Sequence, residues 1–145
     1  MPRTAENEFG AAVLDKEDRA VAFVEVKVEP VDNWATVLTR QLANFDERDA
    51  FILTVDLNCI QLYKPVGQNL GEPIVRLDSK QVLQHYDPEF GRKRVFEFYL
   101  LTLVLAWLRD LAYHWKSENP PSAEELRRAG LLEKFEGGTT QRFGD

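Results

Sequence analysis

Five short runs of mainly apolar residues, bounded by polar and turn-forming residues, predict β-strands. The runs are residues 11–14, 19–28, 51–55, 59–64 and 74–77. The charged, turn-prone residues 15–18 separate the first two runs, and 56–58 separate the next two, so each pair is expected to form an antiparallel hairpin. Proline and glycine recur in 65–73, which predicts a loop before the fifth strand.

Apolar residues recur at helical spacing in four other segments, which predict helices. These segments are residues 33–47, 79–86, 92–116 and 122–130. Asp32 or Asn33 is expected to cap the first helix, and Ser122 with Glu125 forms a capping-box signature for the last. The run 98–108 is almost uniformly apolar, but a bilayer span needs about 20 such residues. It is therefore expected to be a buried helix, with no membrane partner.

The order of these elements predicts one α/β domain with a mixed sheet flanked by helices. We assign residues 1–91 to an α/β core, 92–136 to a helical extension of the same domain, and 137–145 to a flexible tail. The apolar stripe of the 92–116 helix is wider than one sheet face requires. This helix either packs between the sheet and the last helix or forms a homodimer interface, and we favour the homodimer.

Composition narrows the classes of function. The 145 residues are 44 % hydrophobic, as expected for one folded domain with a sizeable core. The net charge of −6 argues against a general nucleic-acid coat protein, but it does not exclude a nucleic-acid enzyme with a local basic rim. Cys59 is the only cysteine, which excludes an intrachain disulfide and fits a reducing cytoplasm. Residues 1–10 lack the apolar core of a signal peptide.

The strand VAFVEVKV (21–28) places two charged residues on one face. Glu25 and Lys27 are two positions apart, about 6.6 Å along a strand, and valines fill the opposite face. The pair is either a solvated ion pair or half of a metal-dependent hydrolytic site. In such a site Glu25 and the Val26 carbonyl would bind Mg²⁺. Lys27 would orient or deprotonate the attacking water.

The segments that follow this strand resemble the core of the PD-(D/E)XK nuclease superfamily. The family pattern is a strand with E-x-K, a helix with a glutamine and an aromatic residue four positions later, and then a hairpin. Gln41 and Phe45 take the helical positions, and FILTVDLNCIQLY (51–63) matches the hairpin. The match covers roughly residues 11–64. It is similar in particular to the N-terminal domain of the motor subunit of type I restriction enzymes and to related bacterial proteins of unknown function.

This resemblance implies a restriction-endonuclease-like fold and Mg²⁺-dependent hydrolysis of DNA. It also implies that Glu25 is a metal ligand, that Lys27 activates water, and that Gln41 contacts the site or the nucleic acid. The residues alone leave a second interpretation open, in which Gln41 is simply a polar residue at the edge of its helix. The spacing of Phe45 indicates a core residue.

One family residue is missing at its usual place. The principal metal ligand of the family is an aspartate on the preceding strand, and the corresponding position is Gly10. If residues 17–18 form a two-residue turn, the numbers of paired residues sum to 35 and Gly10 faces Glu25. A four-residue loop would instead place Glu8 opposite Glu25, which makes Glu8 a substitute ligand. The family core also begins with a helix and a strand, for which the ten leading residues leave no room.

Two functions from different classes follow from these observations. The first is a nuclease-like protein whose hydrolytic activity is impaired because Gly10 stands in place of the family's aspartate. The second is a catalytically inactive nuclease-fold module that binds or assembles. Arg92, Lys93 and Arg94 form the only dense basic cluster, at the expected start of the long helix, where cations oppose the helix dipole. They are either a phosphate-binding site for DNA or a solvated helix start.

Overall fold

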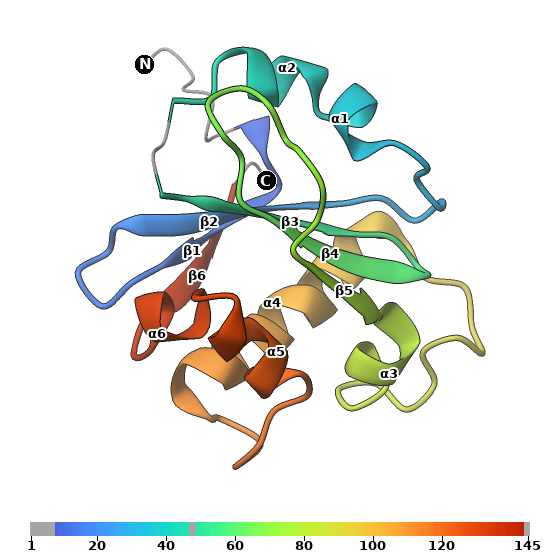
Figure 1. The fold of residues 1–145 in the computed structure, drawn as a ribbon. Coiled ribbons are helices and arrows are strands. Elements are labelled where there is room, and N and C mark those ends of the chain that lie inside the picture. The colour runs from blue at the N-terminus through green and yellow to red at the C-terminus, as the bar shows by residue number, and fades with distance from the viewer. Residues whose placement is uncertain (1–7, 47–48, 144–145) are drawn as a thin grey trace.

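A six-stranded mixed sheet forms the centre of the computed structural model, which describes residues 8–46 and 49–143. The strands are β1 (Ala11–Leu14), β2 (Ala20–Val26), β3 (Phe51–Val55), β4 (Cys59–Tyr63), β5 (Val75–Asp78) and β6 (Thr139–Arg142). Their order is β5-β4-β3-β2-β1-β6. β2 and β3 are parallel, and the other neighbours are antiparallel. The expected mixed sheet flanked by helices is confirmed (Figure 1).

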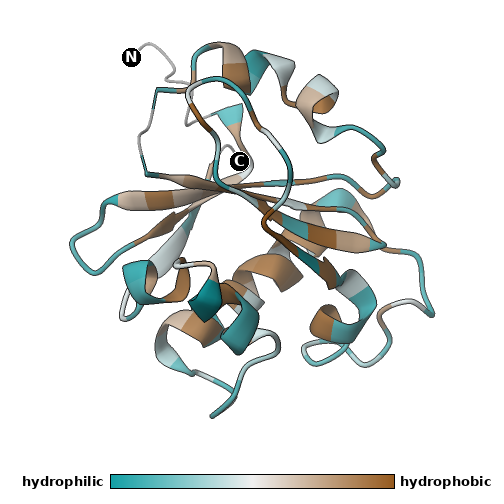
Figure 2. Ribbon diagram, in the orientation of Figure 1, coloured by the Kyte–Doolittle hydropathy of each residue, from teal (hydrophilic) through white to brown (hydrophobic). Residues whose placement is uncertain are grey.

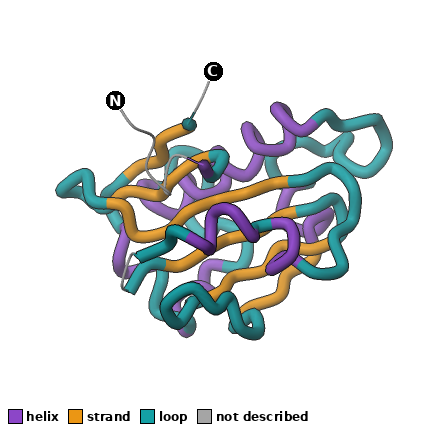
Figure 3. The backbone as a smooth tube through the Cα atoms, turned by 90° about the horizontal axis from the view of Figure 1, so that it is seen from above, coloured by secondary structure: helices purple, strands orange, loops and turns teal. Residues whose placement is uncertain are grey.

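Helices cover both faces of this sheet. They are α1 (Trp34–Val37), α2 (Thr39–Ala43), α3 (Ser79–Leu83), α4 (Glu97–Tyr113), α5 (Ala123–Arg128) and α6 (Leu132–Phe135). α1 and α2 lie on one face, and α3 to α6 lie on the other (Figures 1 and 3). Within the described residues, no helix is long and apolar enough to span a membrane.

In the centre of the first hairpin, β1 and β2 pair in the register that was expected to place Gly10 opposite Glu25, but the Gly10 N–H itself donates to the Val24 carbonyl at 2.9 Å. The numbers of paired residues in its centre sum to 35, as in Ala12 with Phe23. The turn is neither the two-residue turn nor the four-residue loop considered above, because the Asp15 N–H donates to the Arg19 carbonyl (2.8 Å) and pairing shifts by one residue after Val13. This β-bulge compensates for the longer turn and restores the register.

The predicted helix 33–47 is interrupted. Asn33 caps α1 as expected, because its Oδ1 accepts the Ala35 N–H at 3.1 Å. The chain then leaves helical geometry at Leu38 (φ −93°, ψ 18°), and α2 begins at the next residue. The Thr39 hydroxyl donates to a carbonyl of α1 at 2.7 Å, and such bonds compete with the helical ladder. Position 47 lies outside the described residues.

The long helix begins later than its apolar pattern indicates. The prediction was 92–116, but α4 runs from Glu97 to Tyr113, and His114 is left-handed (φ 54°). A bridge between Phe90 and Lys93 holds the preceding segment in a non-helical conformation. The expectation that the basic cluster of residues 92–94 starts the helix is therefore wrong, and the helix-dipole argument does not apply to it.

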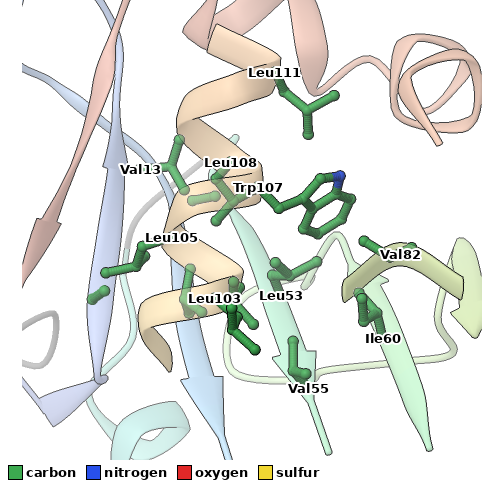
Figure 4. Packing of buried hydrophobic residues seen from close by; sticks show 14 of the residues in the cluster. Val13, Leu53, Val55, Ile60, Val82, Leu103, Leu105, Trp107, Leu108 and Leu111 are labelled. Carbon is green, nitrogen blue, oxygen red and sulfur yellow. The ribbon is translucent and has the colours of Figure 1, made fainter. Parts of the chain in front are cut away.

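α4 packs with its apolar stripe inside the chain. Leu101, Leu105 and Leu108, which widen the stripe, are at most 7 % exposed. They join β1 to β4, α5 and α6 in one apolar cluster with Trp107 at its centre (Figure 4). The interpretation that α4 packs between the sheet and the last helices is confirmed. The stripe that suggested a homodimer interface is accounted for by this packing.

A second, smaller apolar cluster lies between the sheet and α1 with α2. It stacks Phe9 on Phe23 at 5.3 Å between ring centroids, with Phe45 edge-on to both. Phe45 is thus a core residue, as its spacing predicted. Apolar residues gather on the sheet and on the inner sides of the helices, and the loops are polar (Figure 2).

The end of the chain differs most from its prediction. Residues 137–145 were expected to be a flexible tail, but β6 pairs with the outer edge of β1. A Cβ on Gly138 would lie within 1.9 Å of the Leu14 carbonyl oxygen, so only glycine fits where the chain enters β6. The capping box at Ser122 is also absent, because Ser122 is left-handed (φ 63°) and its side chain makes no cap hydrogen bond. The last two residues of the predicted tail lie outside the described residues.

Candidate functional site at the carboxyl end of β2

The end of β2 places the carboxyl group of Glu25 beside Gly10. A Cβ atom on Gly10 would lie 3.3 Å from Glu25 Oε1 and 3.4 Å from Leu101 Cδ2. The glutamate thus occupies space that a side chain at position 10 would need. A cavity of about 190 Å³ adjoins this carboxyl group and is lined also by Glu97 and Arg142. The site therefore lies where β1, β2, β6 and the start of α4 meet.

Glu25 titrates near neutral pH. Burial raises the pKa of its carboxyl group to about 7, and the nearby Glu97 carboxylate adds to this rise. Lys27 and the Gly10 N–H oppose the shift without cancelling it. A partly buried carboxyl group with such a pKa beside a cavity is typical of functional sites, where stability is traded for reactivity or binding.

We expect the Glu25→Gln variant to be more stable than the parent protein at alkaline pH. Because the folded-state pKa exceeds the unfolded value of 4.5, the parent loses stability as pH rises from about 4.5 to about 7. With partial solvent access the loss is about 2 kcal/mol. Urea unfolding at about pH 5 and pH 8 measures it. Glu118→Gln, at an exposed glutamate beyond the end of α4, is the control, and equal pH profiles of parent and Glu25→Gln would contradict the assigned pKa.

Lys27 lies beside Glu25 as predicted, but its ion-pair partner comes from α4. Its Nζ atom is 4.0 Å from Glu97 Oε1, and both side chains are more than 40 % exposed. An exposed pair of this kind contributes little to stability and leaves the ammonium free to meet a ligand. Glu97 was missed because it lies far along the chain and because the long helix was expected to begin five residues earlier.

Gln41 and Glu8 contact each other rather than Glu25. Gln41 is buried, and its Nε2 donates to the Glu8 backbone carbonyl at 3.2 Å. The glutamine thereby holds the segment that leads into β1, which supports the interpretation of a polar residue with a structural role. Glu8 Oε2 is buried and has no hydrogen-bond partner in the described part of the chain.

The residues present do not fit the predicted Mg²⁺ site. The expected ligands were Glu25, the Val26 carbonyl and Glu8. Mg²⁺ needs several ionised, hard oxygen ligands at one point, whereas Gly10 brings no carboxylate to Glu25 and Gln41 donates to the Glu8 carbonyl. In residues 8–46 and 49–143, no three His, Cys, Asp or Glu side chains converge as a metal-binding group.

The basic cluster contributes to an aromatic surface next to this site. Lys93 is bound to Asp87 at 3.0 Å, whereas Arg94 lies over the ring of Phe96 at 5.1 Å. Arg142, from β6, lies over the ring of Phe98 at 4.2 Å. Both phenylalanines are 63 % exposed. We call Arg94, Phe96, Phe98 and Arg142 the Phe96–Phe98 surface. Pairing of its two rings with two arginines could not be predicted, because Arg142 lies in the expected tail.

A larger polar pocket lies at the same end of the sheet. It has a volume of about 540 Å³ and lies between the segment 30–35, strand β4 and the loop 70–73. A cavity of about 340 Å³, lined by Lys27, Val31 and Glu97 among others, lies between this pocket and the start of α4. Asp56 braces the pocket, because its carboxylate accepts the Val31, Asn58 and Cys59 N–H groups at 2.8–2.9 Å.

Comparison of the chain with protein-family models, with curated proteins and with solved structures found no match. The function is therefore inferred from the residues at this end of the sheet.

Proposed function

We propose that this chain is a restriction-endonuclease-like domain that binds single-stranded nucleic acid without hydrolysing it. The observation that supports binding is the Phe96–Phe98 surface, in which two exposed rings are each paired with an arginine. Proteins that bind single strands stack bases on exposed aromatic rings and neutralise phosphates with neighbouring cations. Lys27, whose Nζ atom is 4.0 Å from Glu97 at the start of α4, supplies further positive charge.

The net charge of the chain limits how this binding works. At −6, the molecule as a whole repels a polynucleotide, so contact is restricted to a short stretch of strand at the local basic surface. Stacking on the two rings then supplies most of the affinity, and the few phosphate contacts give it only a shallow dependence on salt. Duplex DNA offers no unstacked bases to these rings, and we expect it to bind more weakly.

We propose that the chain does not hydrolyse nucleic acid, because the residues around Glu25 lack the metal ligands of the resembling family. Gly10 stands where the resembling family has its principal acidic ligand, and Gln41 is engaged with Glu8. The resemblance of residues 11–64 to the nuclease superfamily supports a nuclease fold. The glycine at position 10 and the bond between Gln41 and Glu8 support a member of that fold that binds nucleic acid but does not cleave it.

The binding proposal is tested by fluorescence anisotropy with a labelled single-stranded oligonucleotide at low salt. Replacing both Phe96 and Phe98 with alanine is expected to weaken binding at least about tenfold, because each stacked base contributes about 1–3 kcal/mol. Tyr113→Ala removes an aromatic residue that is 49 % exposed at the other end of α4, and it is expected to bind normally. Equal affinity of the double variant and the parent would refute the proposal.

The absence of hydrolysis is tested in the same samples with Mg²⁺ or Mn²⁺ added. The strand and a supercoiled plasmid are expected to remain intact, and Glu25→Ala is expected to behave like the parent. Metal-dependent nicking by the parent that disappears in Glu25→Ala would show that the chain is an active nuclease and would overturn this part of the proposal.

A further inference from the structure

β5 is an edge strand of the sheet. The strand order ends with β5 on one side and with β6 on the other (Figure 1). An edge strand presents unpaired N–H and C=O groups to another chain, and natural edges are commonly blocked by lysine, proline or a β-bulge. Residues 75–78 contain neither lysine nor proline, and they pair with β4 without a shift in register. The outer side of β5 therefore has the regular geometry that strand pairing needs.

The outward hydrogen-bonding groups of β5 belong to its two charged residues. In an antiparallel pair, successive residues point their N–H and C=O groups alternately toward and away from the neighbouring strand. The Ser79 N–H donates to the Asn58 carbonyl at 3.2 Å, so the odd-numbered residues of β5 face β4. The N–H and C=O groups of Arg76 and the N–H of Asp78 therefore point away from β4. These are the groups that a further strand would bind.

The side chains of Arg76 and Asp78 form no ion pair within residues 8–46 and 49–143. Both are exposed on one face of the strand, whereas Val75 and Leu77, on the other face, are partly buried against the main apolar cluster. Asp78 Oδ1 accepts the Lys80 N–H at 2.9 Å, which leaves Oδ2 for another partner. The strand thus carries one cation and one anion two positions apart, and this pattern is complementary to itself.

Charge selects one register for the pairing of β5 with a second copy of itself. Because the outward backbone groups belong to residues 76 and 78, the possible antiparallel registers differ by steps of two residues. With Leu77 on the two-fold axis, Arg76 of each copy faces Asp78 of the other, and the two Leu77 side chains meet. The neighbouring registers place Arg76 opposite Arg76 or Asp78 opposite Asp78, which is repulsive. The outer edge of β6 offers no such match, because residues 139–142 contain no carboxylate.

We propose that this chain forms a symmetric homodimer in which the β5 edges of two copies pair antiparallel and join the two six-stranded sheets into one. The same surface serves both copies, as in other two-fold dimers. Each strand contributes four residues, so the buried area is small and association is expected at high micromolar concentrations. The pairing uses the sheet edge opposite β6 and its Arg142, so it leaves the Phe96–Phe98 surface open and does not depend on the proposed function.

Sedimentation velocity at protein concentrations from about 10 µM to about 1 mM tests the proposal. The parent is expected to pass from monomer to dimer over this range. Arg76→Glu is expected to dimerise at least about tenfold more weakly, because both charge pairs become repulsive. Arg40→Glu, at an exposed residue of α2, changes the net charge by the same amount and is expected to dimerise like the parent.

Mixing two variants separates β5 pairing from any other contact. Asp78→Lys alone is expected to be monomeric, like Arg76→Glu. In an equimolar mixture the two variants again present opposite charges to each other, so a heterodimer is expected. In the parent, the Arg76 N–H is expected to become protected from hydrogen exchange as the protein concentration rises. If Asp78→Lys fails to fold because Asp78 caps α3, this protection and the Arg76→Glu variant decide the result.

Three results would overturn the proposal. The first is a parent protein that stays monomeric up to about 1 mM. The second is equal dimerisation of the parent and Arg76→Glu, which would place the interface elsewhere. The third is a mixture of the two folded variants that remains monomeric. None of these experiments involves nucleic acid, so failure here is distinct from failure of the proposed function.

Discussion

Replacing Trp107 with alanine is expected to lower the free energy of unfolding by about 3–5 kcal/mol. Trp107 is fully buried in α4, at the centre of the cluster that joins the sheet to α5 and α6 (Figure 4). Its removal leaves a cavity and deprives the Pro121 carbonyl of the Nε1–H that it accepts at 2.9 Å. Because small domains are stable by only about 5–15 kcal/mol, this loss is a large part of the total.

Urea unfolding followed by circular dichroism measures this loss, and Trp115→Ala is the matched control. Trp115 also donates its Nε1–H to a carbonyl, that of Ala106 at 2.8 Å, but it is 49 % exposed. Its removal is expected to cost less than about 1 kcal/mol, since surface substitutions have small effects. Similar losses for the two variants would mean that α4 does not form the centre of the core.

Local sequence signals predicted the strands in the first half of the chain more accurately than the strand in its last part. The hairpin around residues 56–58 was predictable because its turn is stabilised locally. The Asp56 Oδ1 atom accepts the Asn58 and Cys59 N–H groups. β6 has no such signal. Its residues are mostly polar, and the strand forms because the unpaired edge of β1 offers hydrogen bonds more than 120 positions away along the chain. Tertiary contacts of this kind are invisible to periodicity.

The candidate site, too, was predicted only where local sequence determines the position of its residues. Glu25 and Lys27 share a face because strand geometry alone places them there. Glu97 and Arg142, which complete the cavity, come from the start of α4, which was predicted five residues too early, and from β6, where no strand was predicted. The role of Gln41 depends on which backbone carbonyl approaches its helix, and no spacing rule contains that information.

Replacing Gly10 with aspartate is expected to create the divalent metal site that the parent chain lacks. The new carboxylate would stand beside Glu25 and supply a second hard oxygen ligand at the end of β2. Gly10 is not in the left-handed region, so a side chain is compatible with its backbone. We expect Mn²⁺ to bind the variant at least about tenfold more tightly than the parent, and bound metal would lower the pKa of Glu25 by stabilising its ionised form.

Without metal the same variant is expected to be less stable than the parent. The new Cβ would lie 3.3 Å from both Glu25 Oε1 and the Val24 carbonyl oxygen, so these atoms must move by a few tenths of an ångström. Such overpacking costs about 1 kcal/mol or more, and the added negative charge raises the pKa of Glu25 further above its value of about 7. Added Mn²⁺ should therefore restore stability to the variant and leave the parent unchanged.

Isothermal titration calorimetry with Mn²⁺ measures the gain, and two variants isolate its cause. Gly10→Asn has nearly the same shape without the charge, and the double variant Gly10→Asp with Glu25→Gln retains only one carboxylate. Neither is expected to bind Mn²⁺ as Gly10→Asp does, because two ionised ligands are needed at one point. Equally tight Mn²⁺ binding by the parent would show that Glu25 already holds a metal with other ligands, and the glycine would then not explain a loss of hydrolysis.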